Sequence, residues 1–207
     1  MASEVDIANR ALSMLGEDRI TALTDNNKGA RAMNARFELL RDAELTSYPW
    51  RFAVKRVSLA ASTDVPAWGY SLIYNLPSDN LRTTKIGGMA INSGAIGVMY
   101  ESTGISTDST PYEIIEGRLH TNMSAPLDYE YIARITNTGL FDPLFVEALA
   151  ARLAADAAEE MTQSKSKKEA ALFTYRKTLS DARRVNSLLK PPRLRSSGRW
   201  MQSRIVG

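Results

Sequence analysis

The chain of 207 residues offers few side chains of the kinds that perform catalysis or bind metal ions. It has one histidine, His120, and no cysteine. The histidine could act as a general base or as a metal ligand, but one histidine without cysteines does not fit most zinc sites. We interpret His120 as a strand residue on a half-exposed face. We also find no Gly-x-Ser-x-Gly nucleophile turn. The sequence therefore predicts no metal ion, no cofactor and no enzymatic activity.

Paired carboxylates are the remaining arrangement that could perform chemistry, because glycosidases use two of them. The candidates fall in two groups, one in the middle of the chain and one further on: Glu101, Glu113 and Glu116, then Asp156, Glu159 and Glu160. We interpret the second group as a solvated or interface face of a helix. Glu116 falls at a predicted hairpin turn, where exposure is the default. A cell-wall or polysaccharide hydrolase is thus the less favoured alternative.

The glycine-rich segment Gly87–Gly97 is not a nucleotide-binding loop by its spacing. It lacks the Gly-Lys-Ser/Thr ending of a phosphate-binding loop, and it does not match Gly-x-Gly-x-x-Gly. We interpret it as a flexible loop or the tip of a hairpin.

The last 18 residues combine basic side chains with prolines, serines and glycines, and they contain no acidic residue. This composition favours an extended arm. Trp200 lies where no intrachain core is predicted, which suits docking into a pocket on another protein. The residues that we expect to form this docking arm are Arg193, Arg195, Arg199, Trp200 and Arg204. A nucleic-acid-binding module that uses the same arginines is the alternative, because basic runs attract phosphate.

Two helices are predicted near the start of the chain. Ser3 is a candidate N-cap, an apolar face follows at intervals of three and four residues, and Gly16 ends the helix. A second helix is expected over 28–47, because Pro49 biases the residue before it away from helix. We expect Arg31, Glu38, Arg41 and Glu44 to face mostly away from its apolar side.

Two more helices are predicted after the middle of the chain. Asp142 is a candidate cap and Pro143 takes the first helical position. The alanine-dense stretch that follows allows close helix packing, either within a bundle or between subunits. The residues that we predict at a subunit interface are Ala151, Ala154, Ala155 and Ala158. The last helix is expected from about 166 to 189, ending before Pro191 and Pro192.

Between these helices the apolar pattern changes to alternation. Strands are expected over 51–59, 68–74 and 127–131, where apolar and aromatic residues recur with period two. A hairpin is expected over 112–120, with Glu116 and Gly117 at its turn. Several short strands separated by turn residues favour a small antiparallel sandwich or barrel.

The fold class that follows is α+β, with the terminal helices packed as a bundle and an antiparallel β domain inserted between them. We expect the helical domain to comprise 1–49 and 138–190, the β domain 50–137 and the arm 191–207. The net charge is only +3. No apolar run approaches the roughly 18 residues that a membrane span needs, and the acidic start does not resemble a signal peptide. We therefore expect no membrane association.

Several stretches, in this order and spacing, resemble the tail tubular protein A family, the adaptor rings of short-tailed bacteriophages. The resemblance covers most of the chain and is carried by four stretches. The first two are Asn9-Arg10-Ala11-Leu12 with Leu15-Gly16, and Arg36 to Phe52, which ends in Ser47-Tyr48-Pro49-Trp50-Arg51-Phe52. The third is Tyr74 to Arg82, and the fourth runs from Tyr112 to Asn122 and continues to Tyr131–Arg134 and Phe141-Asp142-Pro143.

This resemblance implies a structural virion protein. Family members look like rings of twelve subunits that join the capsid portal to the tail nozzle and line the channel through which DNA leaves. By resemblance the partners are the portal protein, a nozzle protein similar to tail tubular protein B, and further copies of the chain. DNA would pass without specific binding. The helical face and the arm would meet the portal, and the β domain the nozzle. The chain would be made in the bacterial host cytoplasm and act in the virion tail.

Overall fold

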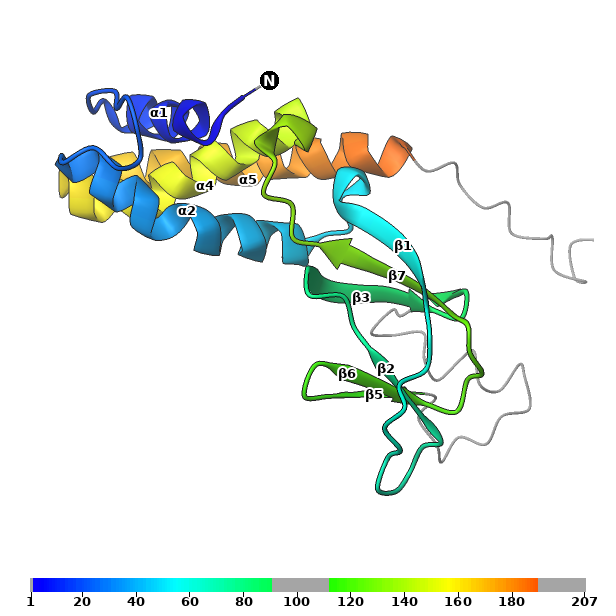
Figure 1. Cartoon of the computed structure of the whole chain (residues 1–207). Helices are drawn as coiled ribbons and strands as arrows, with labels where there is room; N and C mark the ends of the chain where they lie inside the picture. The colour runs from blue at the N-terminus through cyan, green and yellow to red at the C-terminus, as the bar shows by residue number, and fades with distance from the viewer. Residues whose placement is uncertain (1, 91–111, 190–207) are drawn as a thin grey trace, which may run out of the picture.

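The computed structural model describes residues 2–90 and 112–189 and has an α+β fold, as predicted (Figure 1). Helices lie at one end of the molecule and two antiparallel sheets project from the other. The helices are α1 (Glu4–Leu15), α2 (Lys28–Ser47), α4 (Pro143–Thr162) and α5 (Lys165–Leu188). Among the described residues, no helix is long and apolar enough to cross a bilayer.

Both ends of α1 follow the sequence signals. The Ser3 hydroxyl accepts a hydrogen bond from the backbone N–H of Asp6, and the Asp6 carboxylate accepts one from the backbone N–H of Ser3. This reciprocal capping box satisfies two donors that the first helical turn leaves free. Gly16 ends the helix with φ of 71°, a left-handed conformation that glycine adopts without steric cost.

The bundle is organised around α4, which packs against α1, α2 and α5. The apolar faces of α1 and α2 are buried against it through Leu12, Leu15, Met33 and Phe37. Pro143 is at the start of α4 as expected, but the Asp142 side chain makes no capping hydrogen bond. That part of the prediction was wrong: Asp142 occupies the N-cap position through its backbone alone.

The strands form two antiparallel sheets. The large sheet has the order β1-β7-β3-β4 and the small sheet the order β2-β6-β5. The strands are β1 (Val54–Leu59), β2 (Leu72–Asn75), β3 (Asn80–Ile86), β4 (Met89–Ala90), β5 (Tyr112–Ile115), β6 (Arg118–Thr121) and β7 (Leu127–Ala133). Side chains of both sheets, among them Tyr74, Leu119 and Tyr129, belong to one hydrophobic core with the helices.

The β5–β6 hairpin has the predicted turn, with Glu116 and Gly117 both at positive φ. The strand expected over 68–74 is wrong in its first half. Only β2 pairs with β6, whereas Trp68 lies in the preceding loop and is 85% exposed. Gly69, at φ of 87°, interrupts an extended path there. Similarly, residues 51–53 form a short 3-10 helix (η1, Arg51–Ala53) before β1 begins.

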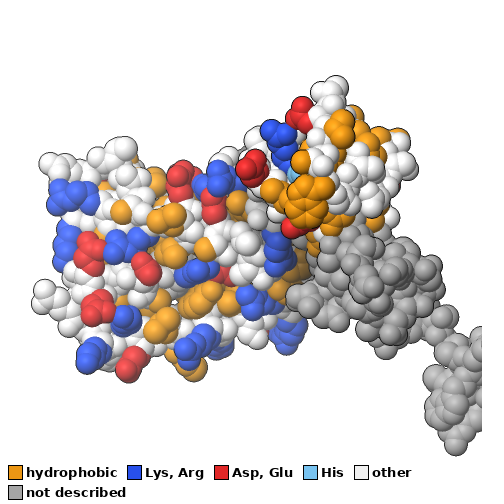
Figure 2. All heavy atoms as spheres, turned by 90° about the horizontal axis from the view of Figure 1, so that it is seen from below, with side chains coloured by type: hydrophobic (Ala, Val, Ile, Leu, Met, Phe, Trp, Pro, Cys, Tyr) orange, Lys and Arg blue, Asp and Glu red, His pale blue; other side chains and the backbone are white. Residues whose placement is uncertain are grey.

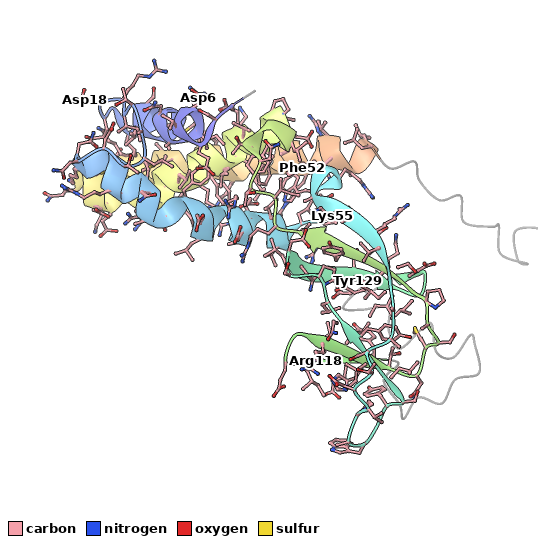
Figure 3. All side chains as sticks on the ribbon, in the orientation of Figure 1. Asp6, Asp18, Phe52, Lys55, Arg118 and Tyr129 are labelled. Atoms are coloured by element: carbon pink, nitrogen blue, oxygen red, sulfur yellow. The ribbon has the colours of Figure 1, made fainter. Side chains whose placement is uncertain are left out.

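The bundle meets the large sheet at a cluster of aromatic rings. Trp50 and Phe52 follow α2, and Phe141 and Phe145 lie around the start of α4, with several ring centroids 5.0–5.5 Å apart. Figure 3 labels Phe52 and Lys55 in this region. Arg134, just after β7, adds an ion pair of 2.8 Å to Asp42 of α2. Rings and ion pair together fix the sheet to the end of the bundle.

Candidate interaction surfaces

The candidate catalytic residues are not gathered into a reactive centre within the described residues. His120 lies on β6 directly opposite Glu113 of β5, and its ring is 6.5 Å from that of Tyr70. Glu116 is exposed at the hairpin turn. Within 2–90 and 112–189, no three His, Cys, Asp or Glu side chains are placed to hold a metal ion. Glu101 and most of the glycine-rich segment lie outside the described residues.

The carboxylates of α4 bind cations of the same chain. Asp156 and Glu160 both accept hydrogen bonds from the Arg36 guanidinium of α2, and Glu159 pairs with Lys168 of α5 at 2.6 Å. The hydrogen bond from Lys168 and its charge hold the pKa of Glu159 below its usual value. These three carboxylates therefore join helices and do not form an acid–base pair.

A hollow of about 440 Å³ opens over the large sheet, and its lining includes carboxylates as well as cations. Glu130 of β7 pairs with Arg56 and Lys85, each at 2.7 Å. Burial raises the pKa of Glu130, but the hydrogen bonds from Lys85 and Arg56 outweigh burial and lower it. An ionised, doubly paired Glu130 cannot donate a proton as the acid of a hydrolase would.

The far end of the small sheet exposes large apolar side chains. We call Val65, Trp68 and Ile115 the tip patch; Val65 is 81% exposed and Ile115, which lines the same cleft as Trp68, is 42% exposed. Seen from below, apolar side chains gather over this end of the molecule (Figure 2). Monomeric proteins rarely expose such a cluster unless it binds a partner.

The loop that carries Trp68 is held at both ends. The Arg118 guanidinium donates to Asp64 at 2.8 Å, and the Ser71 backbone N–H and hydroxyl both donate to Asn122. Figure 3 places Arg118 at the end of the molecule away from the bundle. An ordered loop loses little conformational entropy on binding, which favours affinity.

A small cleft lies beneath this loop. It has a volume of about 150 Å³ and lies between residues 66–70 and the side chains of Glu113, Ile115 and His120. An exposed tryptophan such as Trp68 beside a cleft is a feature of protein–protein hot spots. The tip patch is therefore suited to holding a side chain of a partner protein.

The alanines predicted at a subunit interface are instead inside the bundle. Ala151, Ala154 and Ala158 have no exposed surface, and Ala155 is only 5% exposed. Their small side chains let α4 approach its three neighbours closely, which was the other interpretation of the stretch. The subunit-interface prediction is corrected accordingly, because these side chains have no surface left for a second copy.

Sequence reasoning missed a buried charged network between three helices. Glu44 of α2 has no exposed surface, and its carboxylate accepts hydrogen bonds from Arg152 at 2.6 Å and from the Tyr175 hydroxyl at 2.7 Å. Burial, together with the neighbouring negative Glu44, raises the pKa of Tyr175 to about 12. Arg41 is also buried and pairs with Asp42 at 2.9 Å. The expectation that Arg41 and Glu44 face away from the bundle was therefore wrong.

The docking arm predicted from Arg193, Arg195, Arg199, Trp200 and Arg204 lies outside the described residues. No known family model matches the chain, and no curated protein is significantly similar to it.

Proposed function

We propose that this chain is a structural adaptor of a short-tailed phage virion, similar to tail tubular protein A. It would form a ring that joins the capsid portal to the tail nozzle and lines the DNA exit channel. The resemblance in sequence motifs suggests this role, and the α+β organisation is compatible with it. An adaptor requires exposed contact surfaces more than a reactive centre.

The observation that carries the proposal is the tip patch. It lies at the far end of the β region, away from the bundle, so a partner bound there would leave the helices accessible to a different partner. In the proposed arrangement the tip patch meets the nozzle protein. The bundle and the arm meet the portal.

The charge distribution also favours passage of DNA over tight binding. Outside the arm the chain is close to neutral, and cations such as Arg36, Arg56 and Lys168 are paired with carboxylates. Tight phosphate binding needs many free cations. A channel wall of near-neutral net charge would therefore retain DNA only weakly.

Electron microscopy of the purified chain, alone and mixed with the portal protein of the same phage, tests the proposal. We expect rings of the chain seated on the portal. A chain truncated before Leu194 should lose this attachment if the arm docks there. Absence of any association with portal at low and high salt would reject the adaptor function.

A further inference from the structure

The outer side of α5 carries an exposed stripe of apolar and charged residues. Phe173 is 72% and Leu188 is 76% exposed. Between and beside them lie exposed Glu169, Arg176 and Lys177, none of which forms an ion pair within the described part of the chain. We call Glu169, Phe173, Arg176 and Lys177 the α5 face. They recur at intervals of three and four residues, which places them on one side of the helix.

The outer side of α2 carries a second stripe. Leu39 is 73% exposed, and Arg31, Ala35, Glu38 and Ala43 are exposed around it. We call these five residues the α2 face. Glu38 forms no ion pair with any described residue, and the Arg31 guanidinium donates to the neutral side chain of Asn26. Both helices bury their opposite sides against the bundle.

The two helices run in the same direction through the bundle (Figure 1). Near their C-terminal ends, the Arg183 guanidinium of α5 lies over the ring of Tyr48, and Asn186 accepts a hydrogen bond from the backbone of Arg51. At the other end, Lys28 of α2 donates to the Met161 carbonyl, close to where α5 begins. Copies related by a small rotation would therefore place α5 of one beside α2 of the next in nearly parallel orientation.

We propose that the α5 face of one copy packs in parallel against the α2 face of a second copy. The spacing of the residues sets the register. Glu169, Phe173 and Arg176 are separated by four and three residues, as are Arg31, Ala35 and Glu38. With Phe173 placed over Ala35, Glu169 meets Arg31 and Arg176 meets Glu38.

Charge disfavours the opposite orientation. In an antiparallel pairing centred on Phe173 and Ala35, the cations Arg176 and Lys177 would approach Arg31, and like charges oppose association. In the parallel register the bulky Phe173 ring rests over a small side chain. Both charge pairs flank this contact.

This contact joins two different surfaces, so it is heterologous and repeats from copy to copy until a ring closes. The inference rests on the proposed function for the closed ring, and it assigns the faces through which the copies meet. The buried alanines of α4 take no part in it.

Cysteine crosslinking tests the register directly, because the chain has no cysteine of its own. Ala43→Cys, at the C-terminal end of the α2 face, and Ser180→Cys place thiols side by side across the proposed interface and leave Phe173 and both charge pairs intact. A short bismaleimide should link these two variants when they are mixed at high concentration, and neither variant to itself. A chain with both substitutions should give a ladder of linked copies. Ser13→Cys, exposed on α1, mixed with Ser180→Cys is the matched control.

Charge reversal sharpens the test. Arg176→Glu, introduced into the Ser180→Cys variant, should lower the yield of linked dimer about threefold, and Glu38→Arg in the Ala43→Cys variant should restore it. The proposal would be overturned if the Ala43→Cys and Ser180→Cys mixture linked no better than the Ser13→Cys control. It would also be overturned if each variant alone linked to itself as well as the two link to each other. If the unsubstituted chain still assembles on the portal in that case, the interface assignment fails and the adaptor function stands.

Discussion

In the helical bundle the charged side chains Arg41 and Glu44 are buried, whereas in the loop beside the small sheet the apolar side chains Val65 and Trp68 are exposed. A buried carboxylate is tolerated because Arg152 and Tyr175 satisfy it. Exposed apolar groups contribute little to folding and are retained where a partner covers them. The comparison indicates that the inside of the bundle holds a fixed arrangement of charges, whereas the tip patch has the composition of a contact surface.

The largest effect that distinguishes the two regions is expected at the buried network. Glu44→Ala removes the acceptor shared by Arg152 and Tyr175 and should lower the free energy of unfolding by about 3 kcal/mol. Arg152 remains partly exposed, which keeps the loss from being greater. Glu38→Ala on the same helix is the control and should change stability by less than about 0.5 kcal/mol. Denaturant unfolding measures both, and equal small losses would contradict the role given to Glu44.

The next effect concerns the alanines that pack α4. Ala154→Leu adds volume where no space is left and should cost about 2 kcal/mol of unfolding free energy. Ala170→Leu, at an exposed position of α5, should be close to neutral. If Ala154→Leu were instead neutral to stability, the close packing of α4 described above would be wrong.

At the tip patch we expect a substitution to change binding strongly and the stability of the fold very little. Trp68→Ser should change the unfolding free energy by less than about 0.5 kcal/mol, because the side chain is exposed. The same substitution should weaken binding to the nozzle protein by about 2 kcal/mol, the scale of a hot spot. Leu140→Ser, an exposed apolar residue outside the tip patch, is the control for binding. Calorimetric titration with the nozzle protein compares the variants. Equal affinities of the two variants would contradict the role of the tip patch in binding the nozzle protein.

The smallest effect is a pH dependence of the unfolding free energy that arises from Glu130 in the large sheet. The pKa of Glu130 is lowered in the folded chain from its ordinary 4.5, because the hydrogen bonds from Lys85 and Arg56 outweigh burial. The unfolded chain then binds more protons just below pH 4.5, so stability is complete above that pH and falls as the pH decreases through the lowered pKa. Glu130→Gln should reduce the slope of unfolding free energy against pH in this window. An unchanged slope would contradict the shift.

Local signals in the sequence predicted several helix ends and turns well. The N-cap at Ser3, the end of α1 at Gly16 and the Glu116-Gly117 turn of the small sheet each depend on residues that are neighbours in the chain. The buried role of Glu44 could not be predicted in this way, because Arg152 and Tyr175 lie 108 and 131 residues away.

The β region was predicted less well for two physical reasons. The alternation of Trp68 and Tyr70 has the period of a strand, but these residues lie in a loop whose backbone turns at Gly69. Strand β3 is rich in polar residues and was not predicted, because its place in the sheet depends on pairing with β7. Surface roles such as the tip patch and the α5 face require exposures that a sequence does not give.

The most direct test of the adaptor function is a mass measurement of assemblies made from portal, chain and nozzle protein. We predict that portal and nozzle do not associate with each other alone, that the chain adds to the portal as a complete ring, and that the nozzle binds only after the ring has formed. Direct binding of nozzle to portal, with the chain left unassembled in the mixture, would contradict the central claim.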